Sequence, residues 1–140
     1  MIYGLFLAIT TLTMPSMISD APLKPVAHSV CDVLKASKAY DQKEVVVEAP
    51  LVGSGHGAVL VGEECHKGIY VTHEAGRKDG NWPAFDKALI QKQTGLETAP
   101  LRVKVRGIYR DRVRNGKRTI RQIELNEILE VKFLPKPNTQ

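Results

Sequence analysis

The most unusual chemical feature of this 140-residue chain is a dense run of basic side chains near its C-terminal end. Asp111 is the only acidic residue between positions 102 and 121. The nine basic residues of this run are Arg102, Lys104, Arg106, Arg110, Arg112, Arg114, Lys117, Arg118 and Arg121. Positive charge at this density attracts anions such as nucleic acid, lipid headgroups, lipopolysaccharide phosphates or an acidic protein. The alternative interpretation is a solvated hairpin whose charges keep an exposed strand edge from pairing with other chains.

Aromatic side chains beside such a surface would add stacking to charge attraction. Tyr70 and Tyr109 fall on predicted strands and are our candidate ligand contacts, and ordinary half-buried strand positions are the alternative. Phe85 and Phe133 are expected in the core. Trp82, just before a proline, is expected to pack against the start of a helix.

The two cysteines and four histidines offer two different kinds of site. In an oxidising compartment Cys31 and Cys65 would pair, closing a loop of about 35 residues and adding roughly 3–4 kcal/mol of stability. The alternative is a metal site built from Cys65, His66 and the other histidines, His28, His56 and His73. No C-x-x-C or paired-histidine spacing supports it. We therefore predict a disulfide, no metal and no cofactor.

No catalytic set emerges from the sequence. Ser54 lies in a G-S-G sequence that lacks the G-x-S-x-G frame of a nucleophile elbow. The glycine-rich segment 53–57 matches no phosphate-binding loop and is interpreted as a hairpin turn that needs positive φ. We expect a binding protein rather than an enzyme.

The N-terminal segment predicts export. Residues 1–19 carry no charged side chain, and their apolar stretch is shorter than the roughly 20 residues that a membrane span needs. We expect a signal peptide over 1–20, a linker over 21–28, one domain over 29–134 and a disordered tail over 135–140. A retained N-terminal anchor is the alternative. The expected location is the periplasm or the exterior, with no membrane span once the leader is removed.

Composition and patterning define the domain that positions these residues. The chain is 43% hydrophobic and 25% charged with a net charge of +5, which is typical of one globular domain and not of a disordered or multi-span protein. Ser29 and Asp32 predict the start of a helix, and alternating apolar residues predict the strands. The predicted helices cover 30–40 and 83–94, and the predicted strands cover 43–51, 56–61, 68–73, 101–109 and 117–125, with 128–133 continuing the last. Asn115-Gly116 predicts the turn of the final hairpin.

This order places a helix between the third and fourth strands, as in a five-stranded Greek-key barrel of the OB type. The fold class is therefore mainly β with two short helices, an OB-like barrel preceded by an N-terminal helix. The leader, S-V-C-D-V-L, V-V-V-E-A-P-L, the His56-Gly57 pair, Cys65 and the late V-K-V-R-G strand resemble small exported bacterial proteins with an OB-like domain. The resemblance implies a binding or envelope-associated role.

We expect a non-enzymatic exported domain that engages an anionic envelope component or a protein partner through its basic hairpin. Two alternatives stay open: an oligonucleotide-binding OB module, and a structural or inhibitory interaction protein in which the charges only confer solubility. Nucleic acid is the less favoured partner, because the chain lacks a dense aromatic platform and is expected to be exported. The sequence does not determine the oligomeric state.

Overall fold

The computed structural model describes residues 26–54 and 57–135, together with Gly4, Thr10, Thr11 and Thr13. Most of the expected signal peptide, linker and C-terminal tail, and also His56, lie outside the described residues. The helices are α1 (Val30–Lys35), α2 (Ser37–Tyr40) and α3 (Trp82–Gln93). The strands are β1 (Glu44–Ser54), β2 (Gly57–Gly62), β3 (Lys67–Thr72), β4 (Leu101–Asn115) and β5 (Arg118–Phe133).

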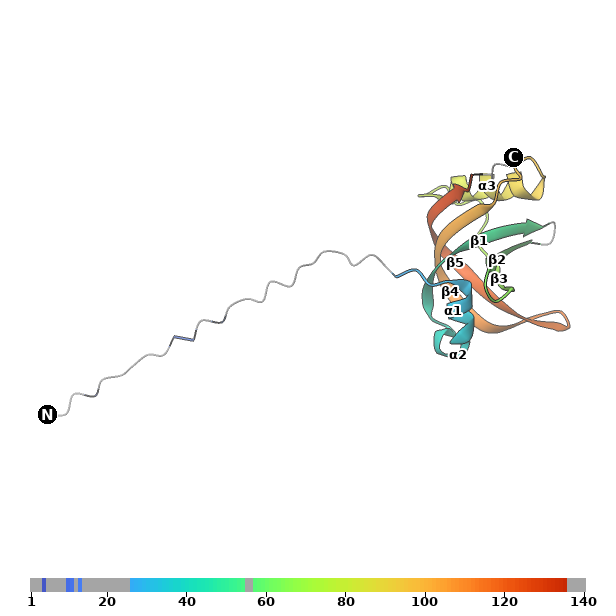
Figure 1. Cartoon of the computed structure of the whole chain (residues 1–140). Coiled ribbons are helices and arrows are strands. Elements are labelled where there is room, and N and C mark those ends of the chain that lie inside the picture. The colour runs from blue at the N-terminus through green and yellow to red at the C-terminus, as the bar shows by residue number, and fades with distance from the viewer. Residues whose placement is uncertain (1–3, 5–9, 12, 14–25, 55–56, 136–140) are drawn as a thin grey trace.

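The five strands close into a barrel in the order β1-β2-β3-β5-β4, which is compatible with the predicted OB-like fold (Figure 1). All neighbours are antiparallel except β3 and β5, which run parallel where Tyr70 lies opposite Gln122. Alternation along β4 buries Leu101, Val103 and Val105 and leaves the basic side chains between them facing outward. The first strand was predicted to end at residue 51 and the hairpin turn to begin at Gly53, but β1 stays paired with β2 through residue 54.

Helix α3 lies between β3 and β4 in the chain and packs its apolar face on the barrel, as predicted. Trp82 and Phe85 are 2% and 0% exposed, and their rings meet edge to face with centroids 5.8 Å apart. A proline in the first turn favours the helix start, and Gly95, with a φ of +75°, follows its end. These contacts confirm that Trp82 packs at the start of the helix.

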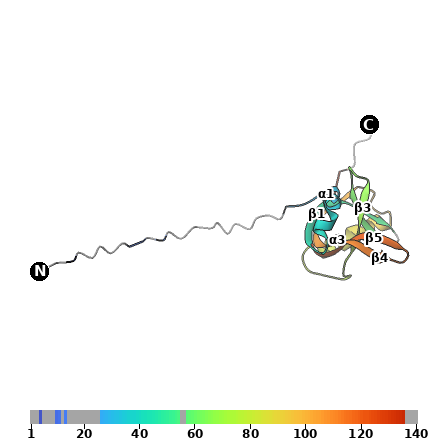
Figure 2. The same ribbon diagram turned by 90° about the horizontal axis from the view of Figure 1, so that it is seen from below.

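Strands β4 and β5 form a hairpin that extends beyond the barrel, away from α3 (Figures 1 and 2). Pairing with β1 ends at Ile108 and pairing with β3 ends at Gln122, so 111–121 protrude as a two-stranded ribbon. The turn was predicted at Asn115-Gly116, but Asn115 pairs with Arg118 in the ladder. The turn therefore consists of Gly116 and Lys117, and Gly116 adopts the positive φ, +62°, that a tight hairpin needs.

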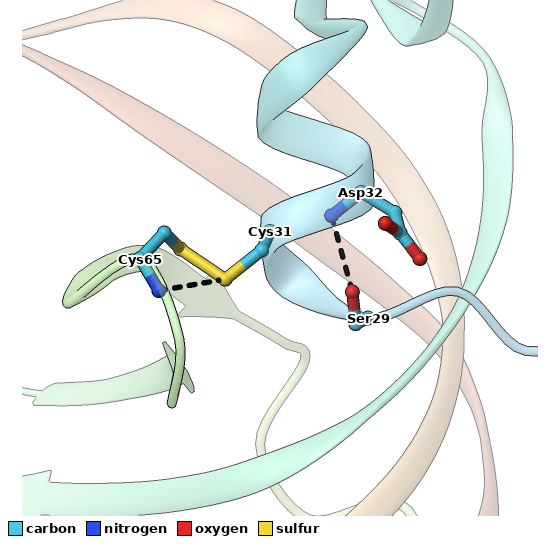
Figure 3. Close-up of a disulfide and its surroundings, with 4 residues drawn as sticks. All are labelled: Ser29, Cys31, Asp32 and Cys65. Atoms are coloured by element: carbon cyan, nitrogen blue, oxygen red, sulfur yellow. Dashed lines mark hydrogen bonds between the residues drawn. A yellow bond between two sulfur atoms is a disulfide. The ribbon is translucent and has the colours of Figure 1, made fainter.

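The predicted N-terminal helix is divided at Ala36 into α1 and α2. The Ser29 hydroxyl accepts a hydrogen bond from the backbone N–H of Asp32, which caps α1 as predicted. Cys31 and Cys65 form the predicted disulfide, and it joins α1 to the turn between β2 and β3 (Figure 3). The helical segment is thereby fastened beside the start of β3.

Candidate anion-binding site

The structure separates the nine basic residues into two groups. The four arginines on the barrel wall and at the base of the ribbon are held by carboxylates. Arg102 contacts Glu48 and Glu63 at 3.4 and 3.0 Å. Arg106 contacts Glu44 and Glu127, Arg110 contacts Glu124 at 3.0 Å, and Arg121 contacts Asp111 at 3.4 Å. Lys104 lies opposite Glu48 on β1 and Glu130 on β5 in the strand register.

The second group consists of Arg112, Arg114, Lys117 and Arg118 on the protruding ribbon, and all four are exposed. Within the part of the chain that the structure describes, none of them forms an ion pair with a carboxylate. The nine basic residues are spread over twenty positions of the sequence. In the structure, carboxylates pair with the arginines of the barrel wall, whereas the four basic residues of the second group have no carboxylate partner among the described residues.

A cleft of about 930 Å³ opens between α2, β3 and the ribbon. Arg112 and Arg118 line it from the ribbon, and Lys38 and Lys67 line it from α2 and β3. None of these four takes part in an ion pair among the described residues. Positive charge from four separate elements thus converges on one hollow, which favours an anionic ligand there.

Asp111 is the one acidic residue among the described residues that line the cleft, and its neighbours already engage it. Its carboxylate accepts hydrogen bonds from the Tyr109 hydroxyl at 3.1 Å and from Arg121 at 3.4 Å, and also from Ser37. Burial acts to raise the pKa of Asp111, but these hydrogen bonds outweigh it and hold the pKa below its ordinary value. Asp111 therefore stays ionised and fixes the base of the ribbon against α2.

The two candidate tyrosines are in opposite environments. Tyr70 is 43% exposed and lines the cleft, so its ring is available to a ligand. Tyr109 is 0% exposed, and its placement on a ligand-facing surface was wrong. At that point β4 turns alternate residues into the barrel, and burial raises the pKa of the Tyr109 hydroxyl, which donates to Asp111. Tyr109 supports the site from within the core.

Lys38 and Lys67 were missed because neither belongs to the dense basic run of residues 102–121. A signal for them did exist. The predicted pairing of Cys31 with Cys65 places the segment after Cys31 beside the segment after Cys65, and these segments contain the two lysines.

The histidines contact their surroundings separately. The His28 ring lies 5.3 Å from that of Tyr40, and His73 lies 5.3 Å from Phe85. His66, with a φ of +53°, is exposed in the turn after β2. Within the described ranges, no three His, Cys, Asp or Glu side chains gather in a way that could hold a metal ion. None of the described helices has the length and apolarity that a membrane span requires.

In comparisons with known proteins, no family model matches the chain and no curated protein matches it in sequence. The site is therefore interpreted from its own chemistry.

Proposed function

We propose that this protein is a non-enzymatic, exported OB-like domain that binds a phosphate-bearing anionic component of the cell envelope through its basic ribbon. The observation that carries the proposal is the contrast between the two groups of cations. Arg112, Arg114, Lys117 and Arg118 lack carboxylate partners among the described residues, whereas the arginines of the barrel wall have them.

Protection of a strand edge would account for the unpaired cations on the ribbon itself. It would not account for Lys38 and Lys67, which line the same cleft from α2 and β3. Convergence of cations from outside the ribbon therefore favours an anionic ligand.

Export is supported by the charge-free N-terminal segment and by the disulfide, since disulfides are typical of oxidising compartments. An exported protein meets lipid and lipopolysaccharide phosphates more often than nucleic acid. Envelope phosphate is therefore the favoured source of the anion.

The test measures binding of the oxidised domain to vesicles containing phosphatidylglycerol, to lipopolysaccharide and to a single-stranded oligonucleotide. The variant Arg112→Gln/Arg114→Gln/Arg118→Gln removes ribbon charge. Because a basic residue near an anionic membrane contributes about 1 kcal/mol, we expect vesicle affinity to fall by about two orders of magnitude.

The matched control is Arg102→Gln/Arg106→Gln/Arg110→Gln, which removes the same charge from the paired group. We expect it to change affinity much less. Equal losses in the two variants would show that net charge alone attracts the ligand. Tight binding only to the oligonucleotide would replace the envelope proposal with the nucleic-acid alternative, and binding to none of the three probes would leave a protein partner in its place.

A further inference from the structure

A second hollow adjoins the basic cleft on the far side of Tyr70. It has a volume of about 300 Å³ and lies between β2, β3 and the outer part of the ribbon. Tyr70 and Ile120 line both hollows, so the two hollows adjoin at these side chains. A ligand that fills the cleft can therefore extend over the tyrosine ring into the second hollow.

The two hollows differ in chemistry. The cleft presents Lys38, Lys67, Arg112 and Arg118. Among the described residues, the second hollow is lined by one charged residue, Arg114. Its other lining residues include Thr72, Asn115 and Gln122, which carry hydroxyl and amide groups, and the apolar residues Val113 and Ile120.

Each of the two hollows suits a different chemical part of one ligand. Guanidinium and ammonium groups are the usual partners of phosphate oxygens. Amides and hydroxyls both donate and accept hydrogen bonds, as sugar hydroxyls require. An exposed tyrosine ring beside aliphatic side chains suits the apolar face of a sugar ring. A strand of nucleic acid would use successive aromatic rings, whereas among the described residues Tyr70 is the one tyrosine, tryptophan or phenylalanine that lines either hollow.

We infer that the site binds a phosphorylated sugar, with the phosphate held in the cleft by Lys38, Lys67, Arg112 and Arg118 and the sugar ring packed on Tyr70. This inference rests on the proposed function, because it names the group on the anionic surface that the domain recognises. It adds that recognition includes the uncharged part of that group.

The test is titration calorimetry of the oxidised full-length domain with glucose 1-phosphate, inorganic phosphate and glucose. We expect glucose 1-phosphate to bind more tightly than either fragment. Lys38→Gln/Lys67→Gln should weaken its binding by about tenfold or more, since hydrogen bonds to charged groups are among the stronger ones. Tyr70→Ala should bring the affinity for glucose 1-phosphate down to that for inorganic phosphate.

The control Arg102→Gln/Arg106→Gln should leave all three affinities unchanged, because these arginines lie outside both hollows. Equal affinity of the wild-type protein for glucose 1-phosphate and inorganic phosphate would overturn the sugar half of the inference. Unchanged affinity in Lys38→Gln/Lys67→Gln would overturn the cleft as the phosphate site.

The vesicle experiment separates this inference from the proposed function. If vesicles bind through Arg112, Arg114 and Arg118 but glucose 1-phosphate does not bind, the inference alone fails. If glucose 1-phosphate binds in the cleft but neither vesicles nor lipopolysaccharide bind, the envelope proposal alone fails.

Discussion

Asp111 connects the ribbon, α2 and the core through one carboxylate. It accepts from Tyr109, Arg121 and Ser37, and its backbone N–H donates to the Asp41 carboxylate at 2.9 Å. The lowered pKa of Asp111 in the folded protein means that the folded state favours the ionised form. Its contribution to stability is therefore present above the pKa of an unfolded aspartate and is lost as the pH falls through the folded-state value.

We predict that Asp111→Asn lowers the free energy of unfolding by about 1 kcal/mol at neutral pH, because it weakens hydrogen bonds to a charged group. The difference from wild type should shrink as the pH is lowered below about 4, where the unfolded carboxyl becomes protonated. Urea denaturation of both proteins at a series of pH values measures this difference in the free energy of unfolding. Asp86→Asn on α3 is the control, and a pH-independent difference for Asp111→Asn would contradict the prediction.

Position 62 must be glycine because the disulfide leaves no room for a Cβ atom there, and not because of its backbone conformation. A Cβ atom added there would lie 2.5 Å from the Cys65 Sγ and 2.6 Å from the Cys31 Sγ, both fixed by covalent bonds. We predict that Gly62→Ala destabilises the fold by about 1–3 kcal/mol, as overpacking does, and raises the fraction of free thiols. Thermal melts and thiol titration measure the two effects.

Gly53→Ala is the matched comparison, because its Cβ would meet the flexible side chains of Gln93 and Leu89 at 3.1 and 3.2 Å. It should cost less than Gly62→Ala. An equal loss from both substitutions would contradict the role assigned to the sulfur atoms.

At the scale of elements, the disulfide holds α1 and α2 against the start of β3. Cys31→Ser/Cys65→Ser should lower the free energy of unfolding by roughly 3–4 kcal/mol, because it frees a loop of about 35 residues in the unfolded chain. Denaturation curves with and without reductant measure this loss. Reduced wild type should match the double variant, and a reductant effect that persists in the variant would show that the disulfide is not its cause.

The elements of the barrel could be predicted because each follows local rules. Period-two alternation identified β4, and Pro83 with Gly95 bounded α3. The length of the ribbon could not be predicted in the same way. Beyond Tyr109 the strand leaves the barrel, so its residues no longer alternate between core and solvent, and the pattern that marks a strand disappears. Tyr109 still follows the alternation that buries Leu101, Val103 and Val105, so the same pattern could have placed it in the core, where its hydroxyl donates to Asp111.

At the scale of the whole molecule, the sequence indicated half of the candidate site. The ribbon cations are contiguous in the chain and visible as a run. Lys38 and Lys67 become part of the cleft only through the closure of the barrel and the Cys31–Cys65 bond. Ion pairing also depends on register, since Arg106 on β4 faces Glu127 only because the two strands pair with bulges between them.

The dependence of the cleft on the disulfide gives a prediction that links stability to binding. The bond fixes the segment that carries Lys38 opposite the strand that carries Lys67, so a ligand meets both lysines already positioned. In Cys31→Ser/Cys65→Ser the α1–α2 segment keeps the core packing of Val30 and Val33 but loses its covalent link to the start of β3, so ordering Lys38 on binding costs more entropy and reduces affinity. Asp111 and Asp41 still hold α2 near β4, so the loss should be partial.

We expect the double variant to bind phosphatidylglycerol vesicles several-fold more weakly than oxidised wild type at a temperature where both are fully folded. Sedimentation with the vesicles measures this affinity, and reduced wild type should bind the vesicles as weakly as the double variant does. Adding Lys38→Gln to the double variant should weaken binding less than the same substitution does in the oxidised protein, because the unfastened lysine contributes less. Full affinity in the folded double variant would show that the ribbon binds without the helical wall of the cleft.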